Sequence, residues 1–342
     1  AHEVGHTIGL AHNYIASTYD RGSVMDYPHP LIKLDSDGNI DLSDAYDVGI
    51  AEWDKVAIRY GYSEFAKDLD EKTELNNILM DGIEKGIVFL SDQDARPHGS
   101  AHPKAHLWDN GIDAADELLR ILKIRKKALS DFSENNIPVG DPMAKLEEVL
   151  VPVYFLHRYQ TEAAVKVIGG LEYNYAIRGD GNYTTKLVEP KVQMKALEAV
   201  LETINPKQLA LDESIIQLIP PKPLGYWRGR ENVKTHTGLT FDPLAAAETS
   251  AKITIELLLN PQRCARLVEL NARENAQPSL DKILEHINFH IQNSAVDSDL
   301  EKEIQFIIGN LFVDELIHLS KNEYASSLVR ATTRGFISDK IN

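Results

Sequence analysis

Apolar residues recur every three or four positions along most of the chain, which is the pattern of helices that pack on a common core. Such stretches dominate after residue 73 and predict helices over Asn76–Lys85, Ala114–Phe132, Met143–Ile168, Lys191–Ile204, Pro243–Leu259, Pro261–Ala272, Leu280–Asn293 and Ser298–Lys321. An earlier helix is predicted over Ser43–Tyr62, with Ser43 as its N-cap and Gly61 at its end. Asp242, which precedes the proline that opens a later helix, is predicted to cap that helix.

Two segments alternate between apolar and polar residues instead, and each contains glycine at a turn. Leu34–Leu42 has an Asp-Gly turn in its middle, and Gly170–Glu189 turns at Gly179–Gly181. Both are predicted to be β-hairpins. Pro220–Thr240 carries prolines and scattered glycines and is predicted to be a long loop. The predicted fold class is therefore mainly α with small β hairpins.

Composition and charge limit the classes of partner. The 342 residues are 43% hydrophobic and 26% charged, as in an ordinary globular protein. A formal net charge of −16 argues against nucleic acid and anionic membrane surfaces as partners. No apolar run approaches the roughly 18 residues of a transmembrane segment. Cys264 is the only cysteine, which excludes an internal disulfide and zinc held by paired cysteines.

Candidate chemistry lies in residues 2–12, which read HEVGHTIGLAH. His2 and His6 are four residues apart, so a helix places both imidazoles on one face, where they can hold one zinc ion. Gly9 can leave the helix through a left-handed conformation and bring His12 back as a third ligand. Three histidines and one exchangeable water form the open geometry of a catalytic Zn²⁺ site. Glu3 is predicted to be the general base for that water.

A second element follows at Ser23-Val24-Met25-Asp26-Tyr27. It resembles the methionine turn of the metzincin clan of zinc peptidases, and the resemblance makes Met25 the floor beneath the three imidazoles. In the astacin-like and serralysin-like branches of that clan, a tyrosine at the position of Tyr27 reaches the zinc. By this resemblance Tyr27 is an extra ligand or a hydrogen-bond donor to the oxyanion, while the other interpretation is that it packs behind the turn.

The resemblance extends over nearly the whole chain. The motifs at residues 91–97 (SDQDARP), 107–111 (LWDNG) and 157–160 (HRYQ) look like those of large bacterial zinc-dependent metalloproteases. Residues 1–62 are then expected to be the zinc-motif and Met-turn part of a catalytic domain, 63–140 a connecting region, and 141–342 a helical domain with a hairpin near 171–188. Proteins of this kind carry an export signal, which implies a location in the cell envelope or outside the cell.

The function implied is hydrolysis of peptide bonds in a peptide or protein substrate by a zinc-activated water. In metzincins a twisted sheet precedes the zinc motif, and this chain begins one residue before the motif, so a longer parent protein is expected. The alternative function is a non-catalytic helical interaction or substrate-presenting module that keeps the zinc motif but is inactive as this fragment.

Other polar clusters allow weaker hypotheses. A calcium site is one reading of the aspartates at 35, 37, 41 and 44, although the glycine comes too early for an EF-hand loop. The histidines at 98, 102 and 106 are predicted to lie in a loop, with a second metal site or a wall of the substrate cleft as alternatives. His286 and His290 are interpreted as an exposed polar face. His157 and Tyr154 are interpreted as structural, with a place over the zinc cleft as the alternative.

Overall fold

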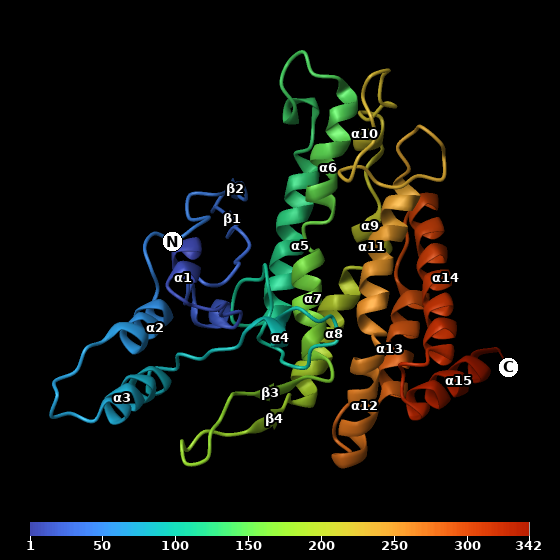
Figure 1. Cartoon of the computed structure of the whole chain (residues 1–342). Helices are drawn as coiled ribbons and strands as arrows, with labels where there is room; N and C mark the ends of the chain where they lie inside the picture. Colours follow the sequence, from blue (N-terminus) through green and yellow to red (C-terminus); the bar gives the residue numbers. More distant parts are fainter. Residues whose placement is uncertain (342) are drawn as a thin grey trace.

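Helices make up most of the computed structural model, which describes residues 1–341 (Figure 1). In the N-terminal part the elements are α1 (His2–Thr7), β1 (Lys33–Leu34), β2 (Ile40–Asp41), α2 (Glu52–Tyr62), α3 (Glu71–Glu84) and α4 (Asp92–Ala95). The middle of the chain forms α5 (Ala114–Ser130), α6 (Leu146–Tyr154), α7 (Arg158–Val167), β3 (Leu171–Tyr173), β4 (Thr185–Leu187), α8 (Pro190–Glu202), α9 (Pro206–Leu209) and α10 (Glu213–Ile216). The last third forms α11 (Pro243–Leu258), α12 (Pro261–Arg273), α13 (Leu280–Asn293), α14 (Asp299–Lys321) and α15 (Ser327–Ile341). Short 3₁₀ turns occur at Ala16–Tyr19, Glu134–Asn136 and Met143–Lys145.

The long helices begin where the sequence supplies a cap. Asp242 accepts a hydrogen bond from Ala245 N at 3.0 Å, which confirms it as the N-cap of α11. Asp113 caps α5 in the same way, through the amides of Ala115 and Asp116. These polar side chains satisfy amide groups that have no partner inside the helix. The helix boundaries after residue 240 therefore fall within one or two residues of those predicted.

Apolar packing joins the helices into one body. The largest cluster of buried apolar side chains draws on α5, α7, α8 and α11 to α15, and a smaller one joins α6 and α10 to the start of α11. Figure 1 shows α5, α7, α11 and α14 running side by side along this body, with the loop around residues 220–240 at one end. Among residues 1–341 no helix is long and apolar enough to cross a bilayer.

Both predicted hairpins are present as antiparallel pairs. Lys33 faces Asp41 across the first, and Leu171 faces Leu187 across the second. Gly38 adopts a φ of +81° at the first turn, where a residue with a Cβ would be strained. Asp35 organises that turn, because its carboxylate accepts hydrogen bonds from the amides of Asp37 and Asn39 at 2.9 and 2.8 Å.

The predicted helix over residues 43–62 is shorter than expected. It begins at Glu52, and Ser43 does not cap it. Asp54 supplies the reason: its buried carboxylate accepts the amide of Ala51 at 2.7 Å and also the Ser23 hydroxyl at 2.7 Å. The start of α2 is thus set by a bond to the Met-turn segment, which helical periodicity cannot reveal.

The predicted helix over residues 143–168 is two helices. Pro152 lacks an amide hydrogen, and the carbonyl of Tyr154 accepts a hydrogen bond from Arg125 Nε at 2.7 Å instead of continuing the helix. Arg158 N therefore turns to the carbonyl of Phe155, at 3.1 Å, and α7 begins a new axis. The buried Arg125 guanidinium thus gains a carbonyl acceptor that would otherwise belong to the hydrogen-bond ladder of the helix.

Helix α15 was not predicted. Its apolar positions are sparse, but Val329 and Phe336, two turns apart, are buried against the larger core. The helix packs on α12, α13 and α14. Burial of this apolar stripe stabilises a helix that the composition of the segment does not predict.

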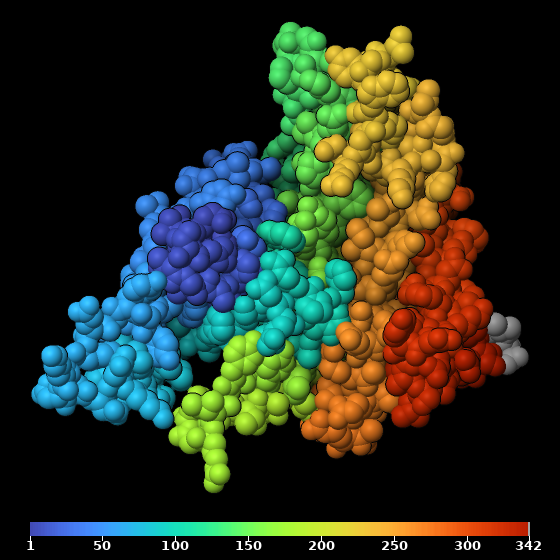
Figure 2. All heavy atoms as spheres, viewed as in Figure 1, coloured from blue at the N-terminus to red at the C-terminus, as the bar shows by residue number. Residues whose placement is uncertain are grey.

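The N-terminal segments lie beside the helical body rather than within it. Figure 2 shows α2 and α3 as a projection on one side, while the segment around residues 90–110 fills the space between residues 1–30 and the body. A small third cluster of buried apolar side chains, made by Tyr14, Ile15, Leu90, Ala95, Ala105 and Leu107, joins these segments. This cluster is what places the HEVGHTIGLAH segment against the rest of the chain.

Candidate metal centre

Helix α1 and the turn after it bring three imidazoles together. His2 and His6 lie on one face of α1, and Gly9 leaves the helix with a φ of +89°. His12 follows on an extended segment that is anchored by Asn13, whose amide donates to the carbonyl of Met25 at 3.0 Å. The Asn13 side chain is fully buried and accepts the amide of Leu90 at 3.2 Å. The third histidine is therefore held between two distant parts of the chain.

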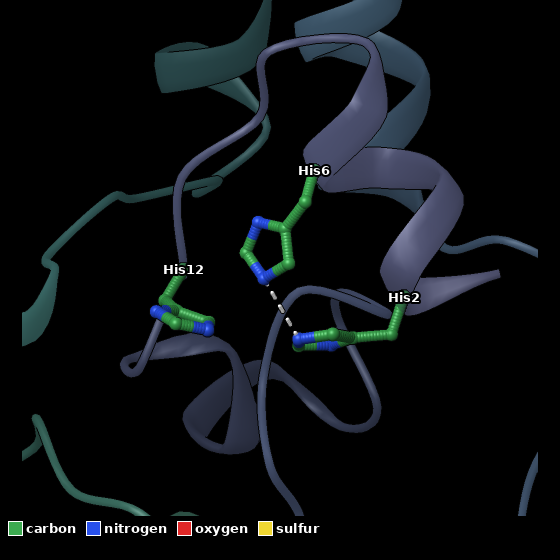
Figure 3. Close-up of side chains that lie close together, drawn as sticks. All are labelled: His2, His6 and His12. Carbon is green, nitrogen blue, oxygen red and sulfur yellow. Dashed lines mark hydrogen bonds between the residues drawn. The ribbon is translucent and has the colours of Figure 1, made fainter.

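The three rings converge on one point (Figure 3). His2 Nε2 and His6 Nε2 are 3.1 Å apart, and one ligand atom from each of the three histidines lies within 4.8 Å of the others. Tetrahedral zinc at 2.0–2.1 Å from each nitrogen needs nitrogen pairs about 3.3 Å apart, and the His2–His6 pair has a spacing close to this. Within residues 1–341 this is the only group of three or more potential ligands so arranged.

Each imidazole is also fixed through its other nitrogen. His2 Nδ1 donates to the carbonyl of Val24 at 2.6 Å, and His6 Nδ1 donates to the carbonyl of Leu10 at 3.0 Å. His12 Nδ1 donates to the Asp92 carboxylate at 2.8 Å. All three partners only accept hydrogen bonds, so the neutral imidazoles carry their protons on Nδ1 and turn their Nε2 lone pairs inward. Lone pairs that face each other at 3.1 Å repel unless a cation lies between them, which fits a metal.

Met25 lies against α1, the helix that carries His2 and His6. It is fully buried, and a Cβ added at Gly5 would lie 2.2 Å from its sulfur. The turn itself is held by Asp54, whose carboxylate accepts the Ser23 hydroxyl at 2.7 Å and the amide of Val24 at 3.0 Å. The same segment therefore carries the sulfur beneath the helix and the carbonyl that orients His2.

Tyr27 and Glu3 occupy different places around the three rings. The Tyr27 hydroxyl lies 3.2 Å from His12 Nε2, and its ring stacks on His2 with centroids 4.6 Å apart. Tyr27 thus faces the imidazoles and does not pack behind the turn. Glu3 is exposed on α1, next to His2, and no other described residue bonds its carboxylate.

Sequence reasoning missed Asp92, which lies eighty residues after His12. Its second oxygen pairs with the Arg96 guanidinium, and Arg96 Nη2 donates to the Tyr14 hydroxyl at 2.7 Å. The Tyr14 ring stacks on His12 with centroids 4.9 Å apart, which closes a ring of contacts around this histidine. Burial raises the pKa of Tyr14, so it stays a neutral partner. The only signal was the motif at residues 91–97, which carries both Asp92 and Arg96.

A buried polar network lies behind Tyr27. Ser17 joins two carboxylates, because its amide donates to Asp26 at 3.1 Å and its hydroxyl to Asp109 at 3.2 Å. Burial raises the pKa of Asp109 to about 7 and also raises that of Asp26, where the charge of Asp109 adds to the effect. Lys166 lies nearby, and burial lowers its pKa to about 8. This network packs the 107–111 motif against the Met turn.

The structure overturns the placement of His157 and Tyr154 over the zinc cleft. Both are buried in the helical body, where Tyr154 donates to the carbonyl of Leu209 at 2.7 Å. His157 Nε2 lies 3.3 Å from the Ser250 hydroxyl, and burial lowers the pKa of this imidazole to about 3. The structural interpretation of these two residues is confirmed.

The histidines at 98, 102 and 106 lie in a loop, as predicted, and do not converge on a metal. His98 is exposed beside Glu162, His102 is buried against Tyr173, and His106 accepts from Lys166 Nζ at 2.8 Å. These partners give each imidazole a local role.

Two other hypotheses also change. The calcium hypothesis fails because no three of the four aspartates form a ligand group in the described chain, and Asp44 pairs with Lys33 and Arg21.

His286 and His290 are not on a fully exposed face. His286 contacts Glu198 of α8, and burial lowers the pKa of His290.

Three converging histidines on an HExxHxxGxxH segment above a buried methionine form a candidate metal centre of the metzincin type. A protein-family model described as Met-zincin matches residues 1–298, so the chain belongs to the Met-zincin family. No curated protein and no solved structure gives a match.

Proposed function

We propose that this chain carries the active centre of a zinc-dependent peptidase, with Glu3 as general base. One observation carries the proposal: three imidazoles turn their Nε2 atoms to one point while each Nδ1 donates to a fixed acceptor. A structural zinc site is closed by four protein ligands, whereas here the protein supplies three. The fourth position is left for a water or a substrate oxygen.

Zinc, when bound to His2, His6 and His12, would supply a Lewis acid that lowers the pKa of a water towards 7 and polarises the scissile carbonyl. Glu3 accepts the proton of the attacking water and delivers it to the departing amine. Its carboxylate is exposed and bonded to no other described residue, so it can change partners during the reaction. Tyr27 donates a hydrogen bond to the oxyanion or serves as an extra ligand.

The test compares zinc content and peptide hydrolysis of the wild-type chain with those of Glu3→Gln, Tyr27→Phe and any form extended upstream of Ala1. We expect one zinc per chain in all of them. Hydrolysis should fall by roughly a hundredfold to ten-thousandfold in Glu3→Gln, because the attacking water loses its base. A smaller loss in Tyr27→Phe at equal zinc content would support the oxyanion role.

Two outcomes decide against the proposal. If no form binds zinc, the metal centre itself is refuted. Zinc binding without hydrolysis in every form would favour the alternative, a non-catalytic interaction or substrate-presenting module. The Glu3→Gln variant keeps the three histidine ligands and the shape of the side chain but removes its charge, so a loss of activity at equal zinc content cannot be assigned to loss of zinc.

Bacterial origin and export to the cell envelope or beyond are also part of this proposal. They rest on the resemblance of the three downstream motifs to large bacterial zinc-dependent metalloproteases, which carry an export signal. Fractionation of cells that produce the natural protein would test them. Retention in the cytoplasm would refute export.

A further inference from the structure

An aromatic surface begins directly beside Tyr27. The amide of Trp108 donates to the carbonyl of Tyr27 at 2.7 Å, while the hydroxyl of the same tyrosine lies 3.2 Å from His12 Nε2. Tyr27 therefore bridges the metal centre and the 107–111 motif.

The backbone holds Trp108 in a conformation that few residues adopt. Its φ is +57°, in the left-handed region, and only Asp20 among the other described non-glycine residues has a positive φ. The neighbouring residues hold this conformation: Asp109 accepts the Ser17 hydroxyl at 3.2 Å, and Asn110 donates to the carbonyl of His29 at 2.9 Å. Despite these anchors the indole is 40% exposed. Backbone strain of this kind persists only where the surrounding structure fixes it, and strained residues cluster at functional sites.

A cation completes this surface. The Tyr159 ring lies 4.4 Å from the Trp108 ring, and the Arg158 guanidinium lies 4.1 Å above Tyr159. Arg158 donates to the carbonyl of Phe155 at 2.9 Å and pairs with no carboxylate in the described chain. Glu117 lies near His29, as Arg158 does, but the Glu117 carboxylate is already paired with the Arg120 guanidinium at 2.6 Å.

We propose that Trp108, Tyr159 and Arg158 form a subsite that binds a carboxylate of the peptide substrate. This rests on the proposed peptidase function and names the substrate class of the same site. The aromatic faces pack against the extended peptide, and the guanidinium binds the carboxylate through charge-assisted hydrogen bonds. An acidic side chain and the C-terminal carboxylate of a short peptide offer the same chemistry.

The test uses a degenerate library of eight-residue peptides, made with free-acid and with amidated C-termini. The zinc-loaded wild-type chain and an Arg158→Met variant are incubated with each library, and cleaved bonds are read by mass spectrometry. Arg178→Met is the matched control, because Arg178 is exposed in the β3–β4 turn and also lacks an acidic partner. Zinc content and thermal unfolding are measured for all three proteins.

For wild type and Arg178→Met we expect preference for a carboxylate at a fixed distance from the cleaved bond, by roughly tenfold to a hundredfold. Arg158→Met should lose that preference while still cleaving neutral peptides. Enrichment of Asp and Glu in both libraries identifies an acidic side chain. Cleavage at a fixed distance from the terminus in the free-acid library alone identifies the C-terminal carboxylate.

The proposal is overturned if wild type shows no carboxylate preference, or if Arg158→Met keeps it. A merely structural role for Arg158 would lower cleavage of all peptides equally, which also counts against it. If wild type cleaves nothing, the peptidase function fails, and the subsite is judged by binding. In that case the zinc-loaded chain should retain carboxylate-bearing peptides of the library in preference to neutral ones, and Arg158→Met should not.

Discussion

The metal-binding region and the helical body are held together by different forces. Thirty-six buried apolar side chains form the main core of the helical body, whereas six form the cluster that supports the metal centre. The metal region relies instead on polar contacts: Asp54 holds the Met turn, Asn13 anchors the third histidine and Asp92 orients it. Burial of apolar area is tolerant of small shifts, while hydrogen bonds demand defined distances and angles.

This difference shows which part of the molecule sets the exact orientation of the histidine rings. The body supplies stability, and segments attached to it supply the contacts that orient the ligands. Asp92 and Trp108 belong to the stretch between the zinc motif and α5, so the metal centre depends on residues that follow it by eighty to one hundred positions. Three substitutions test this division, beginning with the largest expected change in stability.

Truncation of the core should destabilise the body and leave the metal centre intact. Leu197 is fully buried in α8, so Leu197→Ala should lower the free energy of unfolding by about 2–5 kcal/mol. Zinc affinity of the folded protein should change less than twofold. Urea unfolding and zinc titration measure the two quantities. Leu328→Ala, at a residue that is 63% exposed, is the control and should have little effect. A large loss of zinc affinity in Leu197→Ala would contradict the division.

A methyl group at Gly5 should disturb both the floor of the centre and the ligands above it. Its Cβ would meet the Met25 sulfur at 2.2 Å, so we expect Gly5→Ala to cost about 1–3 kcal/mol and to weaken zinc binding. Gly61→Ala in α2 is a matched change, because a Cβ there meets no atom within 4 Å. That variant should be neutral or slightly stabilising. Equal effects of the two changes would show that Met25 does not press on α1.

Removal of the carboxylate that orients His12 should act on the metal and not on the fold. Asp92→Asn keeps the size of the side chain but weakens acceptance from His12 Nδ1, so zinc affinity should fall roughly tenfold to a hundredfold. Competition with a chelator measures this change. Asp94→Asn is made in the same short helix, where Asp94 accepts the Tyr173 hydroxyl at 2.7 Å and does not contact a ligand. Zinc affinity that is equal in the two variants would refute the positioning role of Asp92.

Local patterns were enough to predict much of the fold. Helices α8 and α11 to α14 and both hairpins follow from periodicity, caps and glycines, because these features act over a few residues. Spacing also identified His2, His6 and His12 as a ligand group, since four residues make one helical turn and Gly9 permits the exit that follows.

Tertiary structure alone decided the remaining features. The start of α2 depends on Asp54 bonding the Met turn, and the break between α6 and α7 depends on Arg125 taking a carbonyl from the ladder. Asp92 is the partner of His12, and Trp108 is the partner of Tyr27. No periodic pattern of apolar residues in their segments predicts these contacts. Hydrogen bonds between residues far apart in the chain leave no local signature. The sequence therefore determines which histidines are candidate ligands, and the three-dimensional fold determines how their rings are oriented.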